Sequence, residues 1–148
     1  MKKKIMPDGY FTILLLLSIL IHYMYPIVNL VLYPYNLIGI ILIIAGIVIT
    51  LITNFALLKK KTSIKPFDTP TAFITSGPFK ISRNPIYLGM TIILIGVETV
   101  LGSLSPYIFP VIFVVIINIL IIPVEEKDLE NKFGEKYLEY KTKVRRWI

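Results

Sequence analysis

Two long apolar stretches fill the first half of the chain. No Asp, Glu, Lys or Arg occurs from Gly9 through Leu58, which is enough length for two membrane-spanning helices of about 20 residues each. The pattern predicts a first span over about residues 10–32, in which Pro26 is tolerated. A second span is predicted over about residues 37–58, and a tight connector at residues 33–36 joins the two.

The second half of the chain contains two further apolar stretches. The third span is predicted to start at Pro85 and run to about residue 104, and the fourth to cover about residues 107–124. Glu98 is the one charged residue between Ile86 and Val124. An ionisable group inside a span is a functional candidate. Because Glu98 lies about one turn from the end of its span, we expect its side chain to reach the membrane surface instead.

The residues after the fourth span follow a different pattern. Apolar and aromatic residues recur every three or four positions, at Leu129, Phe133, Tyr137, Tyr140 and Val144. This spacing makes one stripe along a helix whose other face carries Lys and Glu. We therefore predict a C-terminal amphipathic helix over residues 125–146 that lies on the membrane surface and breaks or bends near Gly134. The expected fold is an all-α integral membrane protein, one domain over residues 1–148, with four transmembrane helices and this interfacial helix.

Composition and charge agree with a membrane protein. The sequence is 55% hydrophobic with a mean hydropathy of +0.76, which is too apolar for a soluble domain. The net charge is +7, but every Lys and Arg lies in Met1–Lys4, in Lys59–Arg83 or after Val124, beside the apolar stretches. We therefore expect membrane lipids, and no nucleic acid, as partners. The positive-inside rule places both termini and the loop 59–83 in the cytoplasm.

The residue types exclude several kinds of chemistry. The chain has no cysteine, which excludes disulfides, thiolate metal sites and a cysteine nucleophile. His22 is the one histidine and lies within an apolar stretch. It cannot form a metal cluster alone, and we expect it to make a packing hydrogen bond.

The junction between the long loop and the third span is the first candidate site. Asn84 suits an N-cap and Pro85 suits the first helical position, where its missing N–H costs nothing. The preceding loop carries Lys80 and Arg83, so the helix start would receive an anionic or strongly polar ligand. The alternative is a well-capped membrane helix with no ligand.

An acidic pair at the end of the fourth span is the second candidate site. Glu125 and Glu126 should lie at the same membrane depth as Asn84 and Tyr87. A half-buried carboxylate pair beside the ring of Phe79 or Tyr87 is suited to a cation. The alternative is a pair of solvated acids that end a helix.

Three separated motifs carry a resemblance to a known family. They are Thr75–Phe79, Ser82–Gly89, and the set Glu125, Glu126, Leu129, Phe133, Gly134, Tyr137, Tyr140 and Val144–Arg146. In order and spacing, the region from Thr71 to Ile148 resembles the isoprenylcysteine carboxyl methyltransferase and phospholipid methyltransferase superfamily. The resemblance implies a membrane methyltransferase that binds S-adenosyl-L-methionine on the cytosolic side, between the last two spans and the C-terminal segment. The implied acceptor is a hydrophobic, lipid-like or prenylated small molecule in the membrane.

The resemblance also implies roles for particular residues. The implied donor-binding residues are Thr71, Ala72, Phe73, Ile74, Phe79, Asn84, Pro85, Ile86, Tyr87 and Glu125. Arg83 and Glu126 are the candidate catalytic residues, and for an amine acceptor Glu126 is the nearest group that could accept the proton. The isoprenylcysteine branch of the family often has His where this chain has Asn84, and Arg where it has Ile121. Because the chain differs from that branch at both positions, the acceptor stays open between an isoprenylcysteine-like carboxylate and a lipid amine. A nicotinamide-dependent membrane reductase and a non-catalytic membrane scaffold are the alternative functions.

Overall fold

The computed structural model describes residues 6–61 and 71–148, and these residues are mainly helical. In chain order the helices are α1 (Pro7–Met24), α2 (Ile38–Lys59), α3 (Pro85–Leu101), α4 (Ile108–Ile116), α5 (Ile122–Phe133) and α6 (Glu135–Lys143). A π-helical segment (Ile117–Ile121) joins α4 to α5, and short 3-10 turns occupy Tyr35–Leu37, Gly77–Lys80 and Ser105–Tyr107. The described residues contain no β-strand, in agreement with the predicted all-α class.

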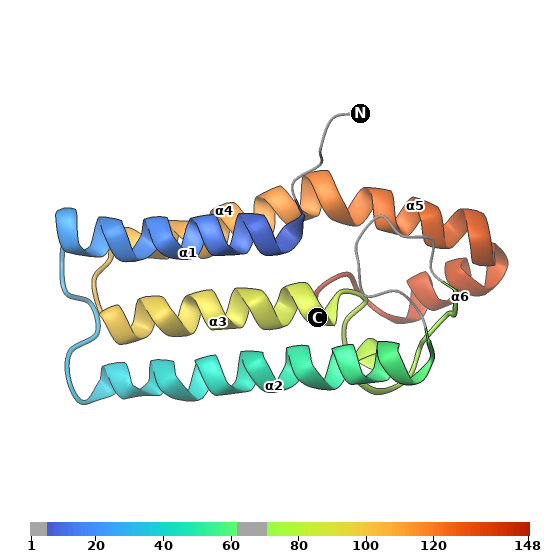
Figure 1. Cartoon of the computed structure of the whole chain (residues 1–148), viewed down its shortest axis with the longest axis horizontal. Helices are drawn as coiled ribbons and strands as arrows, with labels where there is room; N and C mark the ends of the chain where they lie inside the picture. The colour runs from blue at the N-terminus through green and yellow to red at the C-terminus, as the bar shows by residue number, and fades with distance from the viewer. Residues whose placement is uncertain (1–5, 62–70) are drawn as a thin grey trace.

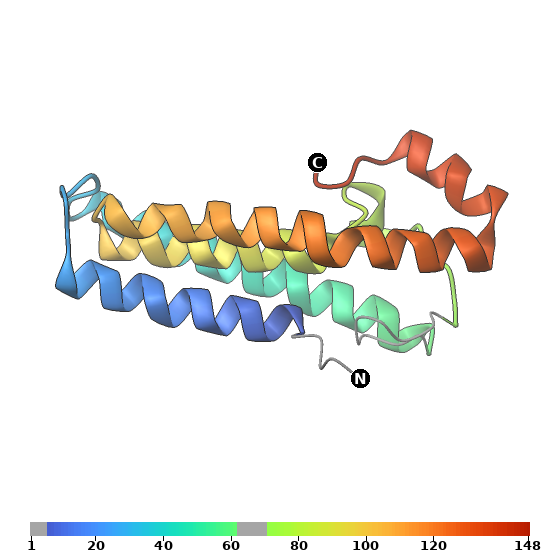
Figure 2. The ribbon, with the colours of Figure 1, turned by 90° about the horizontal axis from the view of Figure 1, so that it is seen from above.

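The first four helices lie side by side along one axis (Figures 1 and 2). Helix α4, the π-helical segment and α5 form one continuous rod that extends past the start of α3, and α6 folds back from the end of this rod (Figure 2). Three helical stretches are long and apolar enough to cross a membrane: Pro7–Met24, Tyr35–Lys59 and Ser105–Phe133. Helix α3 is also apolar but has 17 residues.

The bundle has a small buried core and an apolar outer surface. Leu94, Phe113, Ile117 and Ile122 are fully buried in the core. Large aliphatic side chains such as Ile41, which is 66% exposed, cover the outside of α2. A continuous exposed apolar surface is unfavourable in water and favourable in lipid, so this is the surface of a membrane protein.

Helices α2 and α3 touch through their backbones at two pairs of glycines. A methyl group added to Gly39 would lie 2.4 Å from the carbonyl oxygen of Gly96, and one added to Gly46 would lie 2.6 Å from that of Gly89. Both distances are shorter than any van der Waals contact. The seven-residue spacing on each helix places both pairs on the facing surfaces, and small residues there allow close helix packing.

The end of α1 differs from the prediction. The helix stops at Met24 rather than near residue 32, because Pro26 disfavours the helical conformation at the residue before it. That residue, Tyr25, has φ −148° and ψ 61°. Near this end, His22 Nδ1 lies 2.7 Å from Ser103 Oγ, which is the predicted packing hydrogen bond.

The segment 25–34 crosses the end of the bundle and covers the end of α3. The N–H of Leu30 donates to the carbonyl oxygen of Gly102 (2.7 Å). Glu98, one turn before Gly102, is 0% exposed and lies near the fully buried Ser18 of α1. Neither carboxyl oxygen of Glu98 has a hydrogen-bond partner within the part of the chain that the structure describes. The prediction that Glu98 reaches the membrane surface was therefore wrong, because its side chain is enclosed within the bundle on the side of α1.

The fourth apolar stretch and the C-terminal helix do not separate where expected. The helical rod continues from α4 past Val124 to Phe133, since no Gly follows Pro123 until Gly134. The predicted break at Gly134 is confirmed: this residue has φ +54°, a conformation that glycine adopts easily and other residues avoid. The chain turns there, and α6 returns toward the start of α3 (Figure 1).

The glycine contacts predict a specific loss of stability. We expect Gly46→Ala to lower the free energy of unfolding by about 1–3 kcal/mol, because the new methyl group would meet the backbone of α3 and force the helices apart. Unfolding in mixed detergent micelles measures this quantity. The control is Ala45→Val, which adds bulk at the neighbouring exposed position. Equal stability of the two variants would contradict the backbone contact.

Candidate active site

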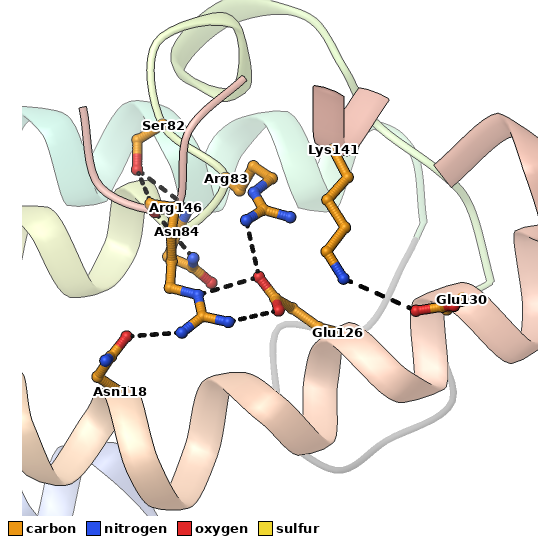
Figure 3. A network of polar contacts seen from close by, with 8 residues as sticks. All are labelled: Ser82, Arg83, Asn84, Asn118, Glu126, Glu130, Lys141 and Arg146. Atoms are coloured by element: carbon orange, nitrogen blue, oxygen red, sulfur yellow. Dashed lines mark hydrogen bonds and ion pairs between the residues drawn. The ribbon is translucent and has the colours of Figure 1, made fainter. Parts of the chain in front are cut away.

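The predicted site residues come from the loop before α3, the start of α3 and the first turn of α5, which meet at one end of the bundle. The C-terminal segment lies beside them (Figure 3). Pro85 is the first residue of α3, and Asn84 occupies the N-cap position, as predicted. The side chain of Asn84 makes no capping bond. Its Nδ2 donates instead to the carbonyl oxygen of Arg146 (2.9 Å), while its backbone N–H donates to Ser82 Oγ (3.1 Å).

A hydrogen bond joins the two candidate sites of the sequence. Tyr87 Oη donates to Glu125 Oε1 at 2.7 Å, which joins the first turn of α3 to the first turn of α5. Tyr87 is buried, whereas Glu125 is half-buried. The expectation that these two motifs meet is confirmed, and a partly accessible carboxylate lies beside an aromatic ring.

The second glutamate holds two arginines (Figure 3). Arg146 donates through Nη2 to Glu126 Oε2 (2.7 Å) and through Nε to Oε1 (3.2 Å). Arg83 Nη2 lies 3.2 Å from the same Oε1. The side chains of Glu126 and Arg83 are 9% and 10% exposed, and that of Arg146 is 33% exposed. These are charge-assisted bonds in a poorly solvated place, where such bonds are strong.

The charges of this cluster do not balance. Two guanidinium groups face one carboxylate, and Nε and Nη1 of Arg83 are buried with no hydrogen-bond partner among the described residues. Buried polar groups in proteins are almost always hydrogen-bonded. Arg83 therefore has donors that a bound ligand could engage.

The sequence interpretation missed two residues of this cluster. Arg146 Nη1 donates to Asn118 Oδ1 (2.9 Å). Asn118 is the one polar residue in the apolar stretch 107–124 apart from its ends, and a polar residue in a span is a signal that could have identified it. Arg146 belonged to the third motif of the resemblance but was assigned no role, because no spacing rule links it to Glu126.

An aromatic cluster joins the loop before α3 to α5 and α6. Phe73 stacks on Phe133, with ring centroids 5.3 Å apart, and makes edge contacts with Tyr137 and Tyr140 at 6.0 and 5.4 Å. Burial raises the pKa of each tyrosine to about 12, so both are neutral at physiological pH. Tyr140 Oη also donates to the carbonyl oxygen of Phe79 (2.5 Å).

The aromatic cluster corrects the interpretation of the C-terminal stripe. The stripe was expected to anchor the helix on the membrane, but Tyr137 and Tyr140 are 1% and 8% exposed and pack on the loop. These rings therefore pack against the loop before α3, through Phe73, and not against lipid. Among the other implied donor-binding residues, Ile74 is buried and Thr71 Oγ1 donates to the carbonyl oxygen of Lys61 (2.9 Å).

The remaining implied residues lie within the same region. Ala72 is a half-buried residue of the loop beside Phe73, and Pro85 is buried at the start of α3. Ile86 packs against the core that includes Tyr87. The predicted residues thus gather in two groups, one around Glu125 and Glu126 and one around Phe73.

These features define a helical membrane protein with one partly buried polar site at the end of its bundle. The sequence profile of the phospholipid methyltransferase family matches residues 35–136, more than half of the chain, and the protein belongs to this family of methyltransferases. An uncharacterized protein of Haemophilus influenzae is 41% identical over 63 residues, which are 43% of this chain and the full length of that protein. No solved structure gives a significant match. The matched region contains both candidate sites and ends before Arg146.

The ion pairs predict the effect of neutralising Glu126. We expect Glu126→Gln to lower the free energy of unfolding by about 3 kcal/mol, because the buried guanidinium of Arg83 and the partly exposed one of Arg146 lose their counter-charge. Denaturation in mixed micelles measures the change. Glu130→Gln is the matched control, since Glu130 lies one turn further along α5 and pairs with Lys141 at 3.8 Å in a well-exposed place. This control should cost less than about 1 kcal/mol, and a similar loss in both variants would contradict the buried cluster.

Proposed function

We propose that this protein transfers a methyl group from S-adenosyl-L-methionine to a hydrophobic acceptor embedded in the membrane. The observation that carries the proposal is the 2.7 Å bond between Tyr87 and Glu125. It brings together two residues that are 38 positions apart in the chain and that both lie in the region matching the methyltransferase family. No feature of the described residues favours the reductase or the scaffold over this activity.

The residues present fit a sulfonium cofactor. A half-buried carboxylate beside an aromatic ring attracts a cation more strongly than it would in water, and Glu125 with Tyr87 provides this pair. When bound, S-adenosyl-L-methionine would supply an activated methyl group. Asn84, through its side-chain amide, and the loop residues 71–74 would contact the rest of the donor.

Arg83 and Glu126 take complementary roles in this proposal. Arg83 keeps two guanidinium donors without a partner among the described residues, and these would bind and orient an oxygen of the acceptor. Both carboxyl oxygens of Glu126 already accept hydrogen bonds from Arg146, and Oε1 is also ion-paired with Arg83. We therefore assign Glu126 to fixing Arg83 rather than to accepting a proton. Alignment of acceptor and donor is a large part of what such a displacement requires.

The proposal includes a membrane arrangement. The 17 residues of α3 would span about 26 Å at 1.5 Å per residue, close to the ~30 Å thickness of the hydrocarbon layer. We propose that α3 crosses the membrane beside α2, which gives four spans with both termini in the cytoplasm. Glu125, Glu126 and the start of α3 would then face the cytoplasm, where the water-soluble donor is found.

Cofactor binding tests the proposed function directly. We expect S-adenosylmethionine and S-adenosylhomocysteine to bind the purified protein in detergent, and NADPH to give no heat in the same calorimeter. Glu125→Ala should weaken donor binding by about 1–3 kcal/mol, the usual cost of removing a polar partner in a buried site. Glu130→Gln again serves as the control and should bind like the unaltered protein. Heat with NADPH alone would move the protein to the reductase class.

The membrane arrangement has a separate test. The chain has no cysteine, so single cysteines can be introduced and treated with a membrane-impermeant thiol reagent on intact cells. We expect label at Asn36→Cys and Ser105→Cys, and none at Ser76→Cys or Lys143→Cys until the cells are opened. The reverse pattern would place the site outside the cell, away from the donor, and the proposed function would be abandoned.

A further inference from the structure

The C-terminal segment, residues 144–148, is bonded to the site through both the backbone and the side chain of Arg146. The carbonyl oxygen of Arg146 accepts from Asn84 Nδ2 (2.9 Å) and from Ser82 Oγ (3.2 Å). The guanidinium of Arg146 donates to Glu126 and Asn118 on the rod. Arg146 therefore connects the start of α3 to the α4–α5 rod (Figure 3).

Neighbouring contacts fix the course of the segment. The backbone N–H of Arg83 donates to the carbonyl oxygen of Arg145 (3.0 Å). Trp147 packs against the apolar core of the bundle. The segment is thus tied to the loop before α3 by a backbone bond, with the guanidinium of Arg146 directed to Glu126 and Asn118 and the side chain of Arg145 exposed.

The orientation of Asn84 depends on this segment. An N-cap side chain is normally held by the N–H groups of its own helix, but Asn84 makes no such bond. Its amide is oriented by the carbonyl oxygen of Arg146, a residue 62 positions away in the chain. If the segment is released, the amide of Asn84 loses the partner that fixes its direction.

We propose that Arg146 is a positioning residue of the donor site, which orients Asn84 from its backbone because its side chain is anchored on Glu126 and Asn118. This inference rests on the proposed function, since it assigns Asn84 to the donor. Three guanidinium nitrogens make the anchor. Lysine has one charged nitrogen and cannot reproduce this fork.

The test is the affinity for S-adenosylhomocysteine, measured by calorimetry on the full chain in detergent. We expect Arg146→Gln to weaken binding about tenfold, the effect of one lost hydrogen bond of about 1.4 kcal/mol. Arg146→Lys should fall between this variant and the unaltered protein. Arg145→Gln is the matched control, because it removes an equal charge from the adjacent exposed side chain, and it should bind normally.

A double variant separates positioning from general weakening of the fold. If Arg146 acts through Asn84, then Asn84→Ala with Arg146→Gln should bind no more weakly than the worse single variant, within about threefold. Trp147 is the one tryptophan, and its fluorescence should shift to the red in Arg146→Gln as the segment leaves the core. This readout needs no ligand.

The outcomes are distinct. No heat in the unaltered protein would refute the proposed function, and this inference with it. Normal binding by Arg146→Gln, or additive losses in the double variant, would refute only the inference. Should Arg146→Gln fail to fold, unaltered affinity in Arg146→Lys would overturn it.

Discussion

The pairing of Glu126 with two arginines is the interaction on which the polar end of this protein depends. Arg83 comes from the loop before α3, and Arg146 from the C-terminal segment, so one carboxylate joins three parts of the chain. Charges in so poorly solvated a place are tolerated only when they are paired. The loop and the C-terminal segment must therefore be in place together, and their order is a condition for the site to exist.

The hydrophobic pattern was a sufficient guide to most of the helices. In lipid every backbone N–H and C=O must be bonded within the chain, so a long apolar stretch has little choice but to form a helix. The break at Gly134 was predictable because its conformation suits glycine alone. The contact between Tyr87 and Glu125 was predictable because both residues were expected at the same end of neighbouring spans. The hydrogen bond between their side chains confirms that they meet.

Features that depend on contacts distant in sequence could not be predicted this way. The end of α1 is an exception: Pro26 is a local signal for it, and the prediction gave more weight to the apolar residues around Pro26. The burial of Glu98 depends on the packing of α3 against α1, where Ser18 lies beside its carboxyl group, and no periodicity in the sequence predicts that contact. Arg146 enters the site only because the chain reverses after α5, so its sequence neighbours give no indication of its partner.

The π-helical segment between α4 and α5 has a consequence for the angular phase of the rod. Asn118 and Glu126 are eight residues apart, and in a regular α-helix of 3.6 residues per turn they would point about 80° apart around the axis. A π-turn takes more residues per turn, so the segment Ile117–Ile121 turns the two side chains back toward a common direction. One guanidinium can then bond both of them. The wider turn thus changes the angle between the side chains of the apolar half of the rod and those of the charged half. It does so without interrupting the helix.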